Sequence, residues 1–197
     1  AAEELGAHAI RANVTDEDDV QRLIAETVEV CGGLDVLVNN AGLGGEVELT
    51  DMTDEQWFSV LDVTLTGTMR MTRAALRHMC SRGTGAIVNN ASVVGWRAQR
   101  GQSHYAAAKA GVMALTRCSA LEAAPHGVRV NAVAPSLAVH PFLAKVTSEE
   151  LLTELAAREA FGRGADPVEV ANVIVFLASD LASYMTGEVV SVSSQHP

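Results

Sequence analysis

The repeated alternation of short apolar runs with helical stretches constrains this chain more than any other sequence feature. The runs are four to six residues long and rich in valine, isoleucine and alanine. Strands that are apolar along their whole length are buried on both faces, and their alternation with helices is typical of parallel sheets. The sequence therefore predicts an α/β fold with helices on both faces of a parallel sheet. The expected strands are 7–12, 34–39, 86–89, 128–133 and 188–192.

Capping residues mark where helices begin. Between Trp57 and Met79 the apolar residues recur three and four apart, which predicts one long amphipathic helix over about 54–80. A second long helix is expected over about 103–124. The first six residues are typical of a last helical turn closed by Gly6, so we expect a segment before them. The expected helix starts are Thr15 before an acidic turn, Thr53 with Gln56, Thr147 with Glu150, and Asp166 with Pro167 and Glu169.

Length and charge narrow the class of protein. The 197 residues suit one domain, 1–197, and the net charge of -10 argues against a nucleic-acid partner, because phosphates are bound by basic clusters. Short apolar runs predict no membrane partner, and the N-terminus lacks the pattern of a signal peptide, so we expect the cytoplasm. The three cysteines are scattered without metal-ligand spacing, which predicts free thiols and no metal.

Tyr105 and Lys109 lie four residues apart, on one face of the second long helix. A nearby cation lowers the pKa of a phenol, and such a pair can exchange a proton with an alcohol or carbonyl oxygen. Taken alone, the pair is weak evidence of function and favours an ordinary helix surface, where Tyr and Lys four residues apart are common. Ser92 alone suggests a strand-end hydroxyl that bonds local backbone, and Asn39 and Asn40 alone suggest a turn.

Together these residues resemble the short-chain dehydrogenase/reductase family from about Gly6 to the C-terminus. The resemblance rests on four ordered motifs and on the 13 positions between Ser92 and Tyr105 (105 − 92). The motifs are Asn39-Asn40-Ala41-Gly42 after a strand, Ser92 with Tyr105 and Lys109, the strand Val130–Pro135, and Tyr184-Met185-Thr186-Gly187 before the last strand.

The resemblance implies a Rossmann-like, doubly wound sheet, NAD or NADP as cofactor, and interconversion of a secondary alcohol and a ketone. Tyr105 would be the general acid/base, Lys109 would bind the nicotinamide ribose and tune Tyr105, and Ser92 would hydrogen-bond the substrate oxygen. A homo-oligomer, dimer or tetramer, would form through the two long helices. Their apolar residues Met69, Met71, Leu76, Val112 and Leu115 suit that surface or the core equally. The implied cofactor-binding residues are Asn13, Val14, Asn39, Asn40, Ala41, Gly42, Tyr105, Lys109, Pro135 and Ser136.

The chain departs from the family pattern near the site. Thr64 stands where the family has a catalytic Asn that holds a relay water, so the relay is expected to be weakened or rebuilt. Ser136 replaces a glycine, and since serine tolerates positive φ poorly, the loop there is expected to be reshaped. Asn13 replaces an Asp that meets the adenine, and still offers a carbonyl acceptor. His140 replaces a threonine and is expected either at the substrate or as a surface imidazole.

The substrate is only broadly indicated. Val94 and Trp96 supply apolar surface after Ser92, while Arg97 and Arg100 could meet phosphate, which suggests a coenzyme A thioester. The C-terminal residues are similar to those of actinobacterial family members linked to sterol and acyl-CoA breakdown.

The family's glycine-rich turn, which binds the cofactor's pyrophosphate at a helix N-terminus, does not occur in these residues. We therefore expect an N-terminally incomplete oxidoreductase domain that lacks the first strand, helix and second strand. The alternative is a non-catalytic module derived from the family and kept for oligomerisation or binding.

Overall fold

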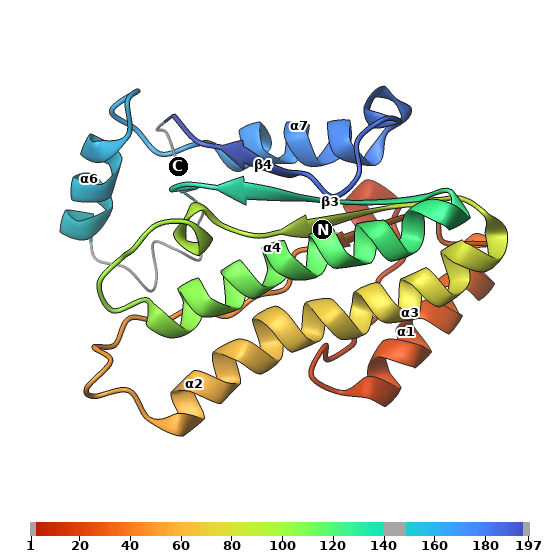
Figure 1. The fold of residues 1–197 in the computed structure, drawn as a ribbon, viewed down its shortest axis with the longest axis horizontal. Helices are drawn as coiled ribbons and strands as arrows, with labels where there is room; N and C mark the ends of the chain where they lie inside the picture. Colours follow the sequence, from red (N-terminus) through yellow and green to blue (C-terminus); the bar gives the residue numbers. More distant parts are fainter. Residues whose placement is uncertain (1–2, 140–148, 195–197) are drawn as a thin grey trace.

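A parallel sheet forms the centre of the molecule, as the sequence predicts. The computed structural model describes residues 3–139 and 149–194. Within them, four parallel strands follow the order β1-β2-β3-β4 (Figure 1). Each strand pairs with the next along the chain, and Asn39 of the first lies opposite Asn89 of the second. The strands are β1 (Val36–Asn39), β2 (Gly85–Asn90), β3 (Val128–Pro135) and β4 (Val189–Val192).

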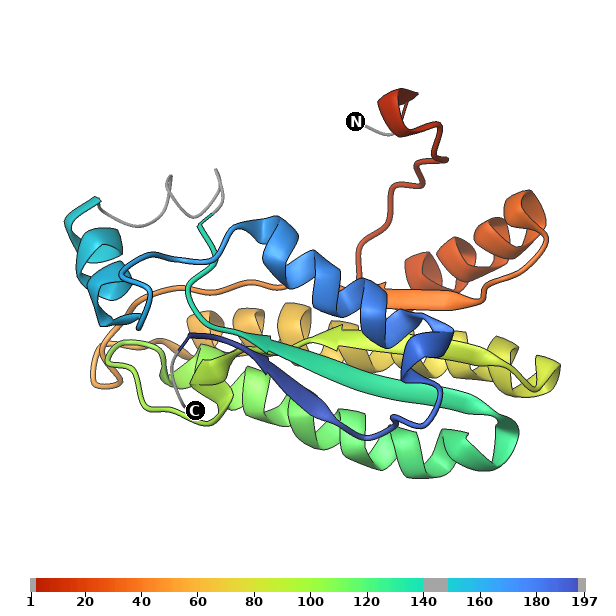
Figure 2. The same cartoon turned by 90° about the horizontal axis from the view of Figure 1, so that it is seen from above.

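Helices cover both faces of the sheet. α1, α3 and α4 pack on one face and α7 packs on the other (Figures 1 and 2). The predicted long helix is continuous from residue 54 to 82, but it widens into a π-helical segment at Asp62–Thr66. Within the described residues, no helix is both long enough and apolar enough to cross a membrane. The helices are α1 (Glu17–Cys31), α2 (Asp54–Leu61), α3 (Gly67–Arg82), α4 (Ser103–Ala123), α6 (Glu149–Arg158) and α7 (Pro167–Ala178).

Two of the four predicted helix starts are confirmed as capping boxes. Thr53 caps α2 with Gln56, and Asp166 caps α7 with Glu169. The cap of α1 is Asp16, whose carboxylate accepts from two backbone N–H groups, and not Thr15. The hydroxyl of Thr15 instead donates to the Asn13 side chain. Thr147 lies outside the described residues.

The predicted strand at 7–12 is wrong. This segment is irregular, and it leads from the N-terminal end, which projects away from the sheet, down to the body of the molecule and α1 (Figure 2). A strand needs a neighbour that pairs its backbone groups, and none of the described strands pairs with it. β1 is the edge of the described sheet, and its Val36 and Val38 are 42% and 40% exposed.

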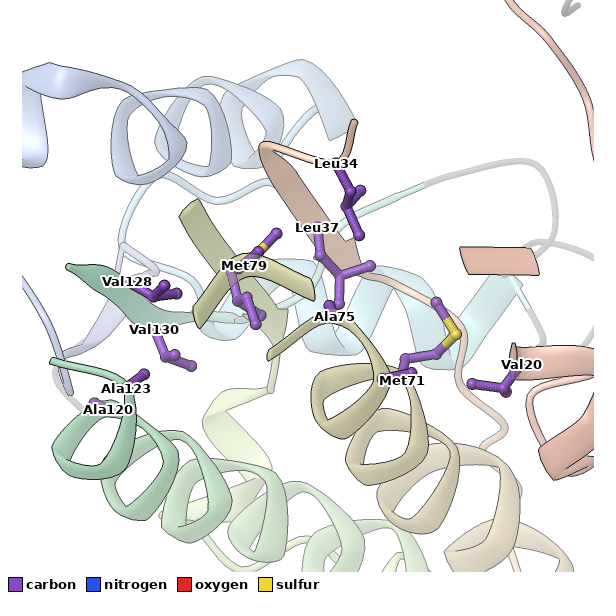
Figure 3. Close-up of a cluster of buried hydrophobic side chains, with 12 residues drawn as sticks. Val20, Leu34, Leu37, Met71, Ala75, Met79, Ala120, Ala123, Val128 and Val130 are labelled. Atoms are coloured by element: carbon purple, nitrogen blue, oxygen red, sulfur yellow. The ribbon is translucent and has the colours of Figure 1, made fainter. Parts of the chain in front are cut away.

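The larger core cluster lies between the sheet and α1, α3 and α4 (Figure 3). Leu37 of β1, Ile87 of β2 and Val130 of β3 meet Met79 of α3 there. Met71 also belongs to this cluster, and Val112 to a neighbouring one with β3. For these two residues the core alternative is therefore confirmed over the oligomer surface, because one stripe of each helix must cover the sheet.

A chain of buried amides and hydroxyls crosses this core, and we call it the amide ladder. The Asn39 amide donates to Thr72 Oγ1 at 3.0 Å and to Asn89 Oδ1 at 2.8 Å. The Asn89 amide donates to Thr116 Oγ1 at 2.9 Å. Buried polar groups are costly unless paired, and these pairings join β1 and β2 to α3 and α4.

Candidate active site

The carboxyl ends of β2 and β3 bring Ser92, Tyr105 and Lys109 together. Ser92 follows β2 and caps a short 3₁₀ turn, where its hydroxyl accepts from Val94 N at 3.4 Å. Tyr105 and Lys109 lie on the first two turns of α4. The Ser92 and Tyr105 side chains are hydrogen-bonded, and the Lys109 ammonium lies 5.5 Å from the centroid of the Tyr105 ring. The spacing in the sequence thus translates into a compact cluster.

Gly95 lets the 3₁₀ turn that begins at Ser92 lie directly on α4. A Cβ at Gly95 would come within 2.7 Å of the Met113 methyl carbon and 3.0 Å of the Ala110 backbone nitrogen. Backbone atoms cannot give way cheaply, so the position requires glycine. The approach of Ser92 to Tyr105 therefore depends on this contact.

Burial sets the protonation of the cluster. Burial lowers the pKa of Lys109 to about 8, and it raises the pKa of Tyr105 above its ordinary value, while the hydrogen bond between Tyr105 and Ser92 opposes that rise. The sequence predicted a lowered pKa for Tyr105, so the direction is corrected, because desolvation by burial has the largest effect on this phenol. Tyr105 keeps its proton at neutral pH, as a proton donor must.

Asn90, at the end of β2, was not predicted as a site residue. Its backbone oxygen accepts from the Lys109 ammonium at 2.6 Å, and its amide donates to Asn40 Oδ1 at 2.7 Å. Its own side-chain oxygen is buried and has no partner among the described residues. Its position at the carboxyl end of a parallel strand could have identified it as a site residue, since ligands of open α/β sheets bind there.

Asn39 ends β1 and Asn40 follows it. Because side chains alternate along a strand, the two predicted asparagines point in different directions. Asn39 faces the core, where its amide belongs to the amide ladder, and its predicted cofactor contact stays a prediction. Asn40 is exposed and meets Asn90. Of the pair, Asn40 alone lies beside the cluster.

Residues 42–45, which we call the glycine loop, lie against the acid/base pair. A Cβ at Gly42 would be 3.7 Å from Lys109 Nζ, and one at Gly44 would be 3.5 Å from the Tyr105 ring. Both the N–H and the carbonyl of Leu43 bond to the Thr64 hydroxyl, each at 2.9 Å. Thr64 is fully buried in the π-helical segment, and Ala41 before the loop is exposed.

Asn13 and Val14 are held beside α3. The Asn13 side-chain oxygen accepts from the N–H and the hydroxyl of Thr15, so the acceptor expected for the adenine already shapes a local turn. The Val14 carbonyl accepts from Arg70, and its side chain sits where Gly67 has no Cβ. The predicted cofactor contact of these two residues stays a prediction.

Pro135 and Ser136 end β3 beside the cluster. The Pro135 carbonyl accepts from Ser92 Oγ at 3.5 Å, and Ser136 N donates to the Val192 carbonyl at 3.1 Å. Among the described residues only glycines have positive φ, so Ser136 occupies its position without that strain, and the expected reshaping of the loop stays a prediction.

The predicted substrate residues lie on the turn after Ser92. Val94 is half-buried and Trp96 is 43% exposed. His140 lies outside the described residues. Arg100, considered for phosphate, pairs with Glu48 at 2.6 Å and is largely exposed.

The cluster fits the nicotinamide side of a dinucleotide. Lys109 offers a buried amine, Asn90 offers a buried oxygen without a partner among the described residues, and Gly42 presents a backbone without a side chain beside Lys109. Such groups suit a ribose or a carboxamide, which carry both donors and acceptors. Among residues 3–139 and 149–194, no group of three or more His, Cys, Asp or Glu side chains could hold a metal ion.

Comparison with known proteins agrees with this geometry. Residues 1–194 match the family model described as "Enoyl-(Acyl carrier protein) reductase". The chain is 64% identical over 186 residues to the Mycobacterium tuberculosis (5R,7aS)-5-hydroxy-7a-methyl-1-oxo-2,3,5,6,7,7a-hexahydro-1H-indene-carboxyl-CoA reductase, covering 94% of this chain and 71% of that protein. It is 45% identical over 184 residues to the cis-4-hydroxycyclohexanecarboxylate dehydrogenase of Sinomonas cyclohexanicum, covering 93% and 74%.

A solved structure gives the same result. The crystal structure of a short chain dehydrogenase from Mycobacterium smegmatis superposes with a TM-score of 0.85 at 58% identity, covering 99% of this chain and 74% of that one. The chain belongs to the short-chain dehydrogenase/reductase family. It is an oxidoreductase of alcohols and ketones, and a nicotinamide cofactor is typical of its family.

Proposed function

We propose that the protein reduces a ketone on an alicyclic ring, with Tyr105 as the proton donor and Ser92 as the donor that orients the substrate oxygen. The contact of the Ser92 and Tyr105 hydroxyls at the carboxyl end of the sheet carries this proposal. Two hydroxyls that already touch can both reach one carbonyl oxygen, where negative charge develops during reduction.

Side chains of the protein itself transfer the proton. A reduced nicotinamide, when bound, would supply the hydride for this reduction. Tyr105 transfers its phenolic proton to the carbonyl oxygen as the alcohol forms, and Ser92 holds that oxygen in place. The Lys109 ammonium, 5.5 Å from the ring, stabilises the phenolate left behind. Since burial favours the protonated phenol, the site is prepared for reduction.

The relatives and the surface beside Ser92 support the proposed substrate class. The two relatives described above act on ring-borne hydroxyl or ketone groups, one in a carboxyl-CoA thioester and one in a free carboxylate. Trp96, 43% exposed at the end of the turn that begins with Ser92, offers a flat apolar face for such a ring. We therefore propose an alicyclic keto acid as its coenzyme A thioester.

The test is a turnover assay on the full-length protein with NADH and with NADPH. The substrates are a bicyclic keto-acyl-CoA, the matching free acid and a linear 3-oxoacyl thioester, with Tyr105→Phe as the inactive control. Preference for the cyclic thioester supports the proposal. Preference for the linear thioester would contradict the ring assignment, and no turnover of any ketone would favour the non-catalytic alternative.

We also propose a homo-oligomer that covers the outer faces of the long helices. Phe58 of α2 and Leu121 of α4 are 62% and 79% exposed, and large apolar side chains at such positions favour a second copy. Light scattering should give a dimer or tetramer, and Leu121→Arg should reduce its mass. A monomeric wild type would contradict this.

A further inference from the structure

His104 carries a buried imidazole on the first turn of α4, directly before Tyr105. The residue is 2% exposed, and its Nδ1 atom is buried without a hydrogen-bond partner among the described residues. Buried polar atoms are nearly always paired in folded proteins, so an unpaired one calls for an explanation. None of the proton-transfer steps proposed above uses this residue.

The other imidazole nitrogen, Nε2, faces the glycine loop. A Cβ built on Gly45 would lie 3.3 Å from Nε2 and 3.9 Å from Cε1 of His104. Apart from its chain neighbours, it would meet no other heavy atom of the described residues within 4 Å. Gly45 is itself exposed. The glycine therefore leaves an open space beside Nε2, at a distance close to that of a hydrogen bond.

This space adjoins the proton donor. A Cβ built on Gly44 would lie 3.5 Å from the Tyr105 ring, and its three nearest heavy atoms all belong to that ring. Consecutive Cα atoms are about 3.8 Å apart, so the spaces beside Gly44 and Gly45 are neighbours. A ring ketone whose oxygen is held by Tyr105 and Ser92 can therefore extend along the loop toward His104.

The imidazole is suited to donate a hydrogen bond into this space. Burial lowers the pKa of His104, so the ring is neutral at neutral pH and carries one N–H. Nδ1 has no acceptor for that proton among the described residues, whereas Nε2 faces the space beside Gly45. The tautomer with its proton on Nε2 offers one donor to a ligand oxygen. The acyl carbonyl of a thioester is such an acceptor.

We propose that His104 is a specificity-determining residue, whose Nε2–H donates a hydrogen bond to the acyl oxygen of the substrate in the space that Gly45 leaves free. This rests on the proposed function, because the acyl group belongs to the alicyclic keto-acyl thioester proposed as substrate. Tyr105 and Ser92 hold the ketone oxygen and His104 holds the acyl oxygen, so the substrate is fixed at two points.

His104→Gln and His104→Asn form a matched pair, because the glutamine amide reaches the position of Nε2 and the asparagine amide that of Nδ1. The full-length protein is assayed with a cyclic keto-acyl-CoA and with the same ring ketone without its acyl group. In His104→Asn, the loss of one hydrogen bond should lower kcat/KM for the thioester about tenfold more than for the plain ketone. In His104→Gln, the ratio of the two kcat/KM values should stay within about threefold of wild type.

Gly45→Ala tests the same space without changing the imidazole. Gly45 does not have positive φ, so alanine introduces no strain of that kind, but its Cβ occupies the position beside Nε2. The variant should lower kcat/KM for the thioester at least about fivefold more than for the plain ketone.

The wild-type protein provides a test that needs no turnover. Cyclohexanecarboxyl-CoA carries the ring and the acyl oxygen but has no ketone to reduce. When it is added to the cofactor-loaded protein, the nitrogen resonance of His104 Nε2 should shift in the NMR spectrum. This measurement needs no variant to fold.

The proposal is overturned if His104→Asn or Gly45→Ala slows both substrates equally, or if His104→Gln loses as much selectivity as His104→Asn. It is also overturned if the His104 Nε2 resonance does not respond to cyclohexanecarboxyl-CoA. Failure of the proposed function is a different result: no ketone would be turned over, although the His104 resonance would still respond to the ring thioester.

Discussion

The ammonium of Lys109 is buried at a free-energy cost that a rise in pH can relieve. Its pKa falls from an ordinary 10.5 to about 8 because of burial, and the side chain is only 4% exposed. At about 1.4 kcal/mol for each tenfold change in proton affinity, this corresponds to about 3 kcal/mol. Below pH 8 both the folded and the unfolded chain hold the proton, and the cost is fully present. Between pH 8 and 10.5 the unfolded chain binds more protons, so stability rises with pH.

Replacing Lys109 with methionine removes this titration while keeping a side chain of similar length. We expect the stability advantage of Lys109→Met over wild type to fall by about 3 kcal/mol between pH 8 and 10.5. The hydrogen bond to the Asn90 carbonyl is lost at every pH, so it offsets the whole curve without changing its slope. The variant should also be inactive, since the phenolate loses its neighbouring cation.

Urea unfolding of the full-length protein at half-unit pH steps, without added cofactor, gives the two curves. Tyr105→Phe is the control, because it keeps Lys109 and removes the other titrating group of the pair. It should show the same rise as wild type below pH 10. A difference between Lys109→Met and wild type that does not vary with pH would refute the reasoning and place the lysine in a hydrated site.

Three further changes test other contacts. Tyr105→Phe should leave the unfolding free energy near that of wild type and reduce kcat by about two to four powers of ten, the usual contribution of a positioned proton donor. A variant that keeps half the wild-type rate would show that Tyr105 is not the proton donor. Asn39→Leu should destabilise the protein by about 1–3 kcal/mol in urea, because Asn89 and Thr72 lose a buried partner, and an unchanged midpoint would show that the amide ladder is dispensable. Gly95→Ala should lower the free energy of unfolding by about 1–3 kcal/mol through its clash with Met113 and the α4 backbone, and it should slow turnover. Gly44→Ala is the control, because its Cβ makes an ordinary 3.5 Å contact. Equal effects of the two changes would contradict the packing argument.

Local chemistry explains which elements the sequence could predict. Thr53 and Asp166 form capping boxes within a single turn, so the pattern alone locates those helix starts. The cap of α1 is missed by one residue because Thr15 and Asp16 are both good caps, and the turn at Asn13 decides between them. The strand at 7–12 depends on a partner strand, which no local pattern supplies.

In the active site, too, local patterns could be predicted from the sequence and long-range contacts could not. Helical periodicity places Tyr105 and Lys109 on one face, and their approach to Ser92 then follows from the resemblance of the motifs. What could not be read from the sequence is the direction of the Tyr105 pKa, because desolvation depends on the packing around the ring. The contact of Thr64 with Leu43 joins residues 21 positions apart and arises from a widened helical turn that no residue pattern predicted.

The amide ladder has a consequence for how the strands find their alignment during folding. β1 and β2 are short and largely apolar, so a slip of two residues would keep every side chain on its own face and leave the hydrophobic contacts nearly as favourable. Such a slip would carry Asn39 away from Asn89, its partner in the paired strands. The Asn39 amide would lose one of its two acceptors and the buried Asn89 oxygen would lose its donor, at about 1–3 kcal/mol for a buried group left unpaired. The Asn39–Asn89 pair thus destabilises misaligned pairings of β1 and β2 that the apolar contacts alone would allow.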